Sequence, residues 1–149
     1  MTFDSRSERN IATLLPAAQV AARIFLAAAK EAMAKHGVDV RIISGNRSYA
    51  EQDALYAKGR TAPGPKVTNA RGGYSNHNFG VAWDIGLFKA KEYLSESPHY
   101  RTLGKIGKTH GLEWGGDWKS FPDEPHFQIN TGLTLAQMRS RIAKGIPIL

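Results

Sequence analysis

The chain has 149 residues, of which 42% are hydrophobic, so it can bury a core and is not expected to be disordered. It contains no cysteine, which excludes disulfides, thiolate zinc fingers and a cysteine nucleophile. The net charge of +7 favours anionic partners such as nucleic acid, lipid head groups or an acidic cell wall, without choosing among them.

The sequence carries no signal for export or for membrane insertion. No apolar run approaches the ~20 residues that cross a bilayer. Residues 1–6 lack the charged-then-apolar pattern of a secretory signal. We therefore expect synthesis in the cytoplasm without a signal peptide. The length favours one domain over residues 1–149, with no separate cell-wall-binding domain, and we expect a monomer.

Hydrophobic periodicity predicts the first half of the fold. Apolar residues at 7–36 recur at steps of three and four, which indicates one long helix or two joined helices, with Ser7 as the N-cap. β-branched residues predict a strand at 38–44, and a short helix is expected at 49–58. Residues 60–74 combine glycine and proline with few large apolar groups, so a functional loop of about fifteen residues is expected.

The second half alternates short strands and helices. Strands are expected at 81–88, 112–114 and 126–129, and helices at 98–110 and 134–143. This order of elements indicates an α+β domain, in which helices pack around a small antiparallel sheet.

Two short segments, 75–84 and 123–126, carry the residues of a metal site. His77, Asp84 and His126 are ligand types that Zn²⁺ prefers, and three protein ligands leave a fourth position open for water. Asp123 precedes the last histidine by three residues, where it could handle the protons of that water. Because the ligands fall at the ends of expected strands, we place the site at the edge of the sheet.

The same segments resemble a known family. Ser75-x-His77-x-x-Gly80-x-Ala82-x-Asp84 is similar to the first metal-binding signature of the zinc D,D-carboxypeptidase and endolysin superfamily, peptidase family M15. The segment 123–126 resembles the second signature. Further similarity at 45–56, 59–64, 67–70 and 114–118 is closest to phage endolysins of the L-alanyl-D-glutamate peptidase type, and the resemblance covers about residues 7–130.

The resemblance implies a D,D-peptidase or hedgehog-like fold and a Zn²⁺ ion bound by the His77, Asp84 and His126 side chains. It also implies that Asp123 is the general base, which passes a proton from water to the leaving amine. Much of the superfamily has glutamate at this place, so Glu124 remains an alternative base.

The resemblance also suggests residues around the substrate. Arg47 matches the arginine that the family places near the scissile carbonyl, where it would stabilise the oxyanion. Ser75 and Gln52 are expected to shape the pocket or bind substrate. Trp114 is expected to line the groove, as are Trp118 and Tyr74, although aromatic residues at such spacing are as often part of a core.

The implied function is hydrolysis of the peptide stem of bacterial peptidoglycan at the L-Ala–D-Glu bond, by a phage endolysin. The enzyme would reach the wall, in the periplasm of a Gram-negative host, through a membrane-permeabilising partner, without nucleic acid or stable membrane insertion. Three alternatives stay open. They are a D-Ala-D-Ala carboxypeptidase or dipeptidase, a zinc-containing module that binds peptidoglycan without cleaving it, and a nucleic-acid-binding role suggested only by charge.

Overall fold

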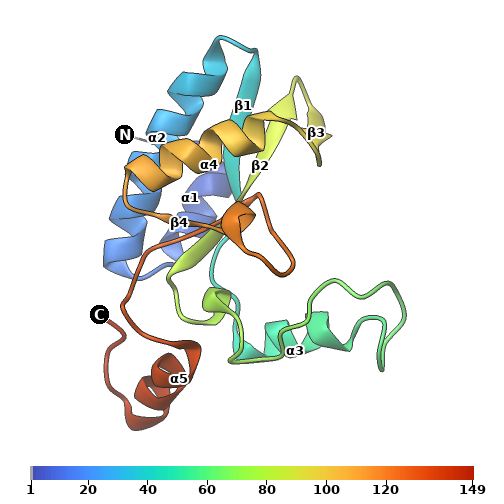
Figure 1. Ribbon diagram of the computed structural model, residues 1–149, viewed down its shortest axis with the longest axis vertical. Helices are drawn as coiled ribbons and strands as arrows, with labels where there is room; N and C mark the ends of the chain where they lie inside the picture. Colours follow the sequence, from blue (N-terminus) through green and yellow to red (C-terminus); the bar gives the residue numbers. More distant parts are fainter. Residues whose placement is uncertain (1) are drawn as a thin grey trace.

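An antiparallel five-stranded sheet lies at the centre of the structure, a computed structural model that describes residues 2–149 (Figure 1). The strands follow the order β1-β2-β5-β4, and β3 pairs with the far end of β2. Their bounds are β1 Val38–Ser44, β2 Ala82–Lys89, β3 Glu92–Leu94, β4 Glu113–Trp114 and β5 His126–Gln128.

Helices surround this sheet, as the sequence predicts for an α+β domain. Helices α1 and α2 pack on β1, and α4 packs on α2, whereas α3 and α5 lie beyond the end of the sheet (Figure 1). Two short 3₁₀ turns, η1 and η2, precede β2 and follow β4. The bounds are α1 Ser5–Ala12, α2 Pro16–Ala34, α3 Tyr49–Ala57, η1 Asn76–Asn78, α4 His99–Thr109, η2 Gly115–Asp117 and α5 Leu135–Lys144.

The N-terminal helical region divides into two helices, because Pro16 takes the first position of α2 and a turn precedes it. The expected N-cap is wrong. Asp4 caps α1 by accepting from the Ser7 backbone N–H at 2.9 Å, and Ser7 itself is fully buried. The Ser7 hydroxyl accepts instead from the backbone N–H of Ile42 at 2.9 Å, which ties α1 to β1. Neither α2 nor any other helix within residues 2–149 has the length and hydrophobicity needed to cross a membrane.

Two apolar clusters hold the fold. The larger one lies between the sheet and helices α1, α2 and α4. A smaller one joins α5 and the segment after it to the turn that precedes β2, through Phe79, Val81, Met138 and Ile148. This second cluster brings α5 next to η1, which carries one of the histidines of the expected metal site.

Candidate metal centre

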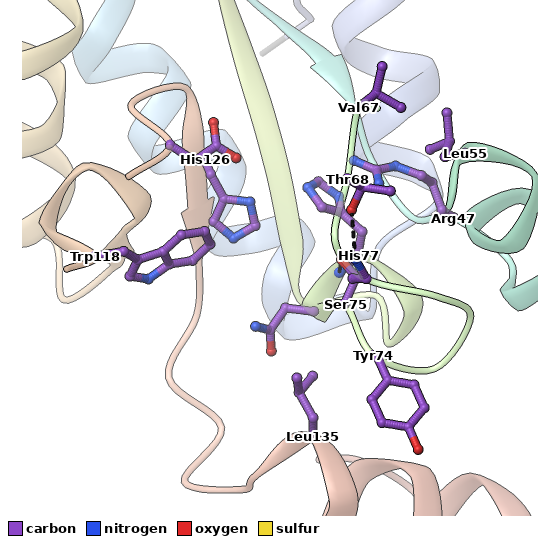
Figure 2. A pocket seen from close by; sticks show the side chains of 13 residues that line it. Arg47, Leu55, Val67, Thr68, Tyr74, Ser75, His77, Trp118, His126 and Leu135 are labelled. Atoms are coloured by element: carbon purple, nitrogen blue, oxygen red, sulfur yellow. Dashed lines mark hydrogen bonds between the residues drawn. The ribbon is translucent and has the colours of Figure 1, made fainter. Parts of the chain in front are cut away.

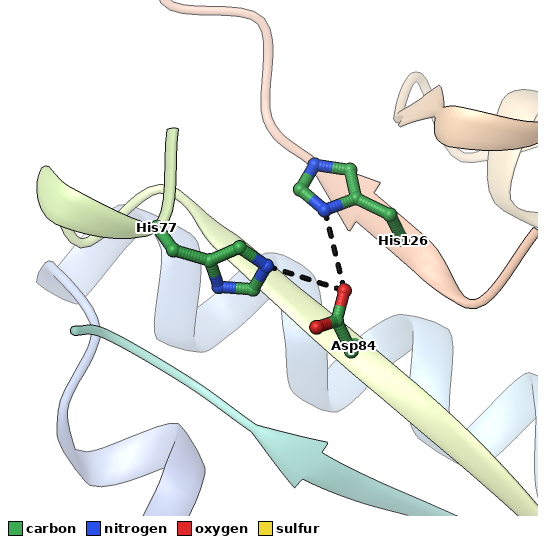
Figure 3. Close-up of side chains that lie close together, drawn as sticks. All are labelled: His77, Asp84 and His126. Carbon is green, nitrogen blue, oxygen red and sulfur yellow. Dashed lines mark hydrogen bonds and ion pairs between the residues drawn. The ribbon is translucent and has the colours of Figure 1, made fainter. Parts of the chain in front are cut away.

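Antiparallel pairing places two of the three expected ligands together. Asp84 on β2 is the direct cross-strand partner of His126 on β5. His77 approaches from η1, and Figure 3 shows both imidazole rings turned toward the Asp84 carboxylate. Asp84 Oδ1 lies 3.2 Å from His77 Nε2 and 3.2 Å from His126 Nδ1. The structure thus assembles the His/Asp/His set that the two sequence segments suggested.

This donor set fits a tetrahedral zinc ion. Bonds of about 2.0 Å require ligand atoms about 3.3 Å apart, which the two 3.2 Å separations match. The three ligand atoms all lie within 4.8 Å of one another. Two imidazoles and one carboxylate are the ligand chemistry of Zn²⁺ sites, so the residues present fit this metal.

The nitrogen that His77 offers to a metal is selected by the backbone. His77 Nδ1 lies 2.9 Å from the carbonyl oxygen of Gly45, just after β1. A carbonyl oxygen only accepts, so Nδ1 must carry the proton and donate it. The lone pair of Nε2 is then free and points at the Asp84 carboxylate.

His126 is oriented by a chain of polar side chains that crosses β5 and β4. Gln128 Nε2 donates to the Glu113 carboxylate at 2.8 Å, which turns the Gln128 amide oxygen toward His126. His126 Nε2 lies 2.7 Å from that oxygen and therefore donates to it, leaving Nδ1 as the free nitrogen. Such outer partners fix ring orientation and tautomer in metal sites.

Sequence reasoning missed the positioning residues Gln128 and Glu113. Alternation along β5 puts residue 128 on the same face as His126, and this pattern could have indicated Gln128 from the sequence. The role of Glu113 depends on the β4–β5 register, in which Glu113 opposes Gln128. Strands this short give no sequence signal for their register.

The Asp84 carboxylate stays charged inside the protein. Burial acts to raise its pKa, but the contacts with the imidazoles of His126 and His77 outweigh burial and hold the pKa far below its usual value. Burial acts to lower the pKa of His126, and the hydrogen bond with Asp84 outweighs it, so the His126 pKa is raised. The centre is therefore arranged around one fixed negative charge, as a cation requires.

Asp123 lines the pocket beside the ligands. Its backbone N–H donates to the Gly115 carbonyl at 2.9 Å, and its carbonyl accepts from the His126 N–H at 3.2 Å. Gly115 permits this packing, because a Cβ at that position would collide with the Asp123 carbonyl and approach the His126 Cβ to 2.9 Å. Burial, and then the Asp84 charge, raise the pKa of the Asp123 carboxyl group.

Glu124, the alternative base, is engaged elsewhere. Its carboxylate lies 3.5 Å from the Arg101 guanidinium on α4, and its carbonyl accepts from Trp114 Nε1 at 2.7 Å. It is not among the residues that line the pocket. The geometry therefore favours Asp123 as the carboxylate that reaches a substrate at this centre.

Arg47 and Gln52 form a pair at the pocket wall. Arg47 Nη1 donates to the Gln52 side-chain oxygen at 2.9 Å, and Arg47 Nη2 lies 3.5 Å from Asp84. Gln52 is fully buried and also donates to the Ala70 carbonyl at 2.8 Å. Gln52 thus orients Arg47 and fastens the 60–74 loop, whereas Arg47 and Ser75 face the pocket.

The structure places Trp114 away from the groove that the sequence assigned to it. Trp114 belongs to the larger core, because its ring packs against Gly104 of α4 and its indole N–H is taken by the Glu124 carbonyl. Trp118 lines the pocket instead, with its ring centroid 4.8 Å from that of His126.

The centre opens into a pocket of about 430 Å³ (Figure 2). His77 and His126 line it, with Trp118 beside His126, and Tyr74 and Leu135 at the end next to α5. A second hollow of about 680 Å³ continues past Asp123 to Phe121. The two share wall residues from the 60–74 loop, so a chain longer than one residue can lie across the centre.

Comparison with known proteins fixes the family. A family model described as D-alanyl-D-alanine carboxypeptidase, of the M15 peptidases, matches residues 68–129. The peptidoglycan L-alanyl-D-glutamate endopeptidase CwlK of Bacillus subtilis is 46% identical over 112 residues, which span 68% of this chain and 67% of that protein. The chain belongs to the M15 peptidases. Within this family it is also 30% identical over 131 residues to the L-alanyl-D-glutamate peptidase of Listeria phage A118, covering 86% of this chain and 42% of the phage protein.

Solved structures of related enzymes confirm the D,D-peptidase fold. The Serratia marcescens L-Ala D-Glu endopeptidase ChiX superimposes with a TM-score of 0.62 at 24% identity, covering 89% of this chain and 92% of that one. The vancomycin-resistance D,D-pentapeptidase VanY, solved as a complex with Zn(II), gives 0.51 at 17% identity and covers 85% and 78%. The His/Asp/His donor set of this chain fits Zn²⁺, the ion present in the VanY structure.

Removing the outer partner of His126 should weaken metal binding. We expect Gln128→Leu to lower zinc affinity by about 10- to 100-fold, because the imidazole loses the acceptor that fixes its orientation. Competition with a chromophoric chelator measures this affinity. Gln128→Glu combined with Glu113→Gln keeps an acceptor for His126 Nε2 and a donor–acceptor pair between the two side chains, so this double variant is the matched control and should retain more affinity than the leucine variant. Equal affinities in the two variants would contradict the orienting role.

Proposed function

We propose that the chain is a zinc-dependent endopeptidase that cleaves the peptide stem of bacterial peptidoglycan between L-Ala and D-Glu. The observation that carries the proposal is the meeting of Asp123 with the His77, Asp84 and His126 ligand set in one open pocket. Two relatives, one bacterial and one from a phage, are named for this bond, which supports the choice of substrate. The net charge of +7 suits a substrate that carries carboxylates.

The residues of the pocket divide the work of hydrolysis. When bound, zinc supplies a Lewis acid and lowers the pKa of water. Asp123 accepts the proton that water loses as its oxygen bonds to the carbonyl carbon, and returns that proton to the amine nitrogen as the C–N bond breaks. The Arg47 guanidinium, held by Gln52, stabilises negative charge on the carbonyl oxygen by about 3 kcal/mol, the effect of a single oxyanion donor.

Loss of the base should abolish turnover without loss of the metal. We expect Asp123→Asn to lower kcat by about 10²- to 10⁴-fold, because the amide cannot accept a proton, while zinc still binds stoichiometrically. Hydrolysis of muropeptides and metal analysis measure the two effects. Glu124→Gln is the matched control and should stay close to wild type. The reverse pattern would make Glu124 the base. Unchanged biological effect in Asp123→Ala would favour a binding module that does not catalyse.

A second candidate function is a D-Ala-D-Ala carboxypeptidase. The description of the matching family model and the likeness to VanY favour it. The two functions differ in the bond that is cut, so they leave different chemical ends on the same substrate.

Digestion of purified peptidoglycan should separate these functions. We expect wild-type protein to create new N-terminal D-Glu, seen by mass spectrometry, and a zinc chelator to abolish it, because the ligand set would lose its metal. Added Zn²⁺ should restore cleavage. Release of free D-Ala without new N-terminal D-Glu would instead identify a carboxypeptidase.

We further propose that the enzyme acts as a phage endolysin, which reaches the wall of a Gram-negative host after a membrane-permeabilising protein releases it. The identity to the Listeria phage peptidase supports a phage origin, whereas the identity to the Bacillus enzyme favours a bacterial one. The pure protein should lyse Gram-negative cells whose outer membrane has been permeabilised, with Asp123→Asn as the inactive control. Activity restricted to Gram-positive walls would contradict the host assignment.

A further inference from the structure

Tyr74, at the end of the pocket next to α5, lies against two arginines from separate parts of the chain. The guanidinium carbon of Arg71 lies 4.6 Å from the centroid of the Tyr74 ring, and that of Arg139 lies 3.9 Å from it. Cation–π attraction favours both contacts, so one ring holds two positive charges that would otherwise repel each other.

Arg139 is directed to this place by the packing of α5. Leu135 lines the pocket, and Arg139 follows it by four residues on the same face of the helix. Arg139 Nη1 donates to the Gly73 carbonyl at 3.1 Å. Gly73 has a φ of +84°, and a Cβ there would meet the Arg139 side chain at 3.1 Å, so glycine permits this close approach. Figure 2 shows Tyr74 and Leu135 together at this end, away from Trp118.

The positive charge of these two arginines is not neutralised by an ion pair. Within residues 2–149, no carboxylate forms a salt bridge with Arg71 or Arg139. Asp53 is the acidic group that acts on Arg71 through space, but its carboxylate accepts from the Gly72 N–H at 2.7 Å. Arg71 is exposed and Arg139 is half-buried, so both can still donate to a ligand.

The charged groups nearer the metal centre are committed to the reaction itself. Asp123 contributes negative charge to the wall, and Asp84 does so beneath it. Arg47 is bound to Gln52 and lies 3.5 Å from Asp84. Arg71 and Arg139 lie against Tyr74, which lines the pocket, so two guanidinium groups that form no salt bridge within residues 2–149 adjoin this end of the groove, whereas the second hollow has Lys66 in its wall. Guanidinium groups bind carboxylates through paired, charge-assisted hydrogen bonds, so a carboxylate is the ligand that this end of the pocket would favour.

We propose that Arg71 and Arg139, held against Tyr74, form a subsite that binds a free carboxylate of the peptide stem during cleavage. The subsite rests on the proposed function, since it assigns a substrate group to the same groove. A stem offers this chemistry at two places: the α-carboxylate of the D-Glu residue, and the side-chain carboxylate of a diaminopimelate in the third position.

Four synthetic stems distinguish the two sources. The D-Glu α-carboxylate is either free or converted to the amide, and the third residue is either diaminopimelate or lysine, which lacks the extra carboxylate. We expect one of these two carboxylates to be the recognised group, so the wild type should cleave stems that carry it with a higher kcat/KM than stems that lack it. Arg139→Gln and Arg71→Gln should each lower kcat/KM on the preferred stem by about tenfold or more, mainly through KM, as for loss of a hydrogen bond to a charged group.

Stems that lack the recognised carboxylate should be cleaved equally by the wild type and both variants. Arg139→Lys should recover part of the preference, because it restores the charge but not the paired donors. Lys144→Gln removes the same charge from an exposed position in the last turn of α5 and should leave the preference unchanged. Arg71 is exposed, so its variant tests the subsite even where Arg139→Gln disturbs the packing of α5.

Equal kcat/KM on all four stems, or an equal loss on all four in both glutamine variants, would overturn the subsite and leave the proposed function intact. Absence of cleavage of every stem would count against the proposed function instead. In that case, calorimetry of the four stems with zinc-loaded Asp123→Asn protein tests the subsite by binding alone. A carboxylate subsite requires that the stem with the recognised carboxylate binds more tightly than the others. Adding Arg71→Gln to this protein should remove that difference in affinity.

Discussion

The antiparallel pairing of β2 with β5 is the constraint on which the rest of the site depends. Asp84 and His126 are direct partners in this register, so two ligands far apart in the sequence meet across one pair of strands. A slip of one residue would turn one of the two side chains to the opposite face of the sheet. β1 pairs on the other edge of β2, and its end delivers Gly45 to His77. The sheet thus sets ligand position and ligand orientation together.

The two histidines present different nitrogens to the same carboxylate, and each choice is made by the fold. His77 uses Nε2 because a backbone carbonyl occupies Nδ1, whereas His126 uses Nδ1 because Gln128 occupies Nε2. Neither ring can rotate or change tautomer without losing a buried hydrogen bond, which carries a cost of roughly 1–3 kcal/mol. The ligand set is therefore organised by the protein before any metal arrives, and zinc needs only small adjustments to complete it.

The sequence predicted the parts of this arrangement that depend on local pattern. Ligand spacing beside glycine and proline pointed to the metal centre, and periodicity located the α-helices and most of the strands. It could not distinguish Trp114 from Trp118, since the burial of Trp114 depends on the packing of β4 against α4. It also missed β3, which is too short for an alternation of apolar and polar residues to be recognised. It missed the role of Glu113 as well, because that role exists only through the cross-strand contact with Gln128. The N-cap error at Ser7 has the same origin, because β1 claims that hydroxyl.

The two apolar clusters of the interior support different parts of the site. The strands that carry Asp84 and His126 are supported by the larger cluster, whereas α5 rests on the smaller one through Met138 and reaches the groove with Leu135. Substitutions on the exposed face of α5, away from Met138, can therefore change the wall of the groove while Asp84 and His126 keep their support. In evolutionary terms, selectivity among wall chemistries and the capacity to hydrolyse can vary separately, and directed evolution of this peptidase toward new cell walls has a natural starting point in one helix.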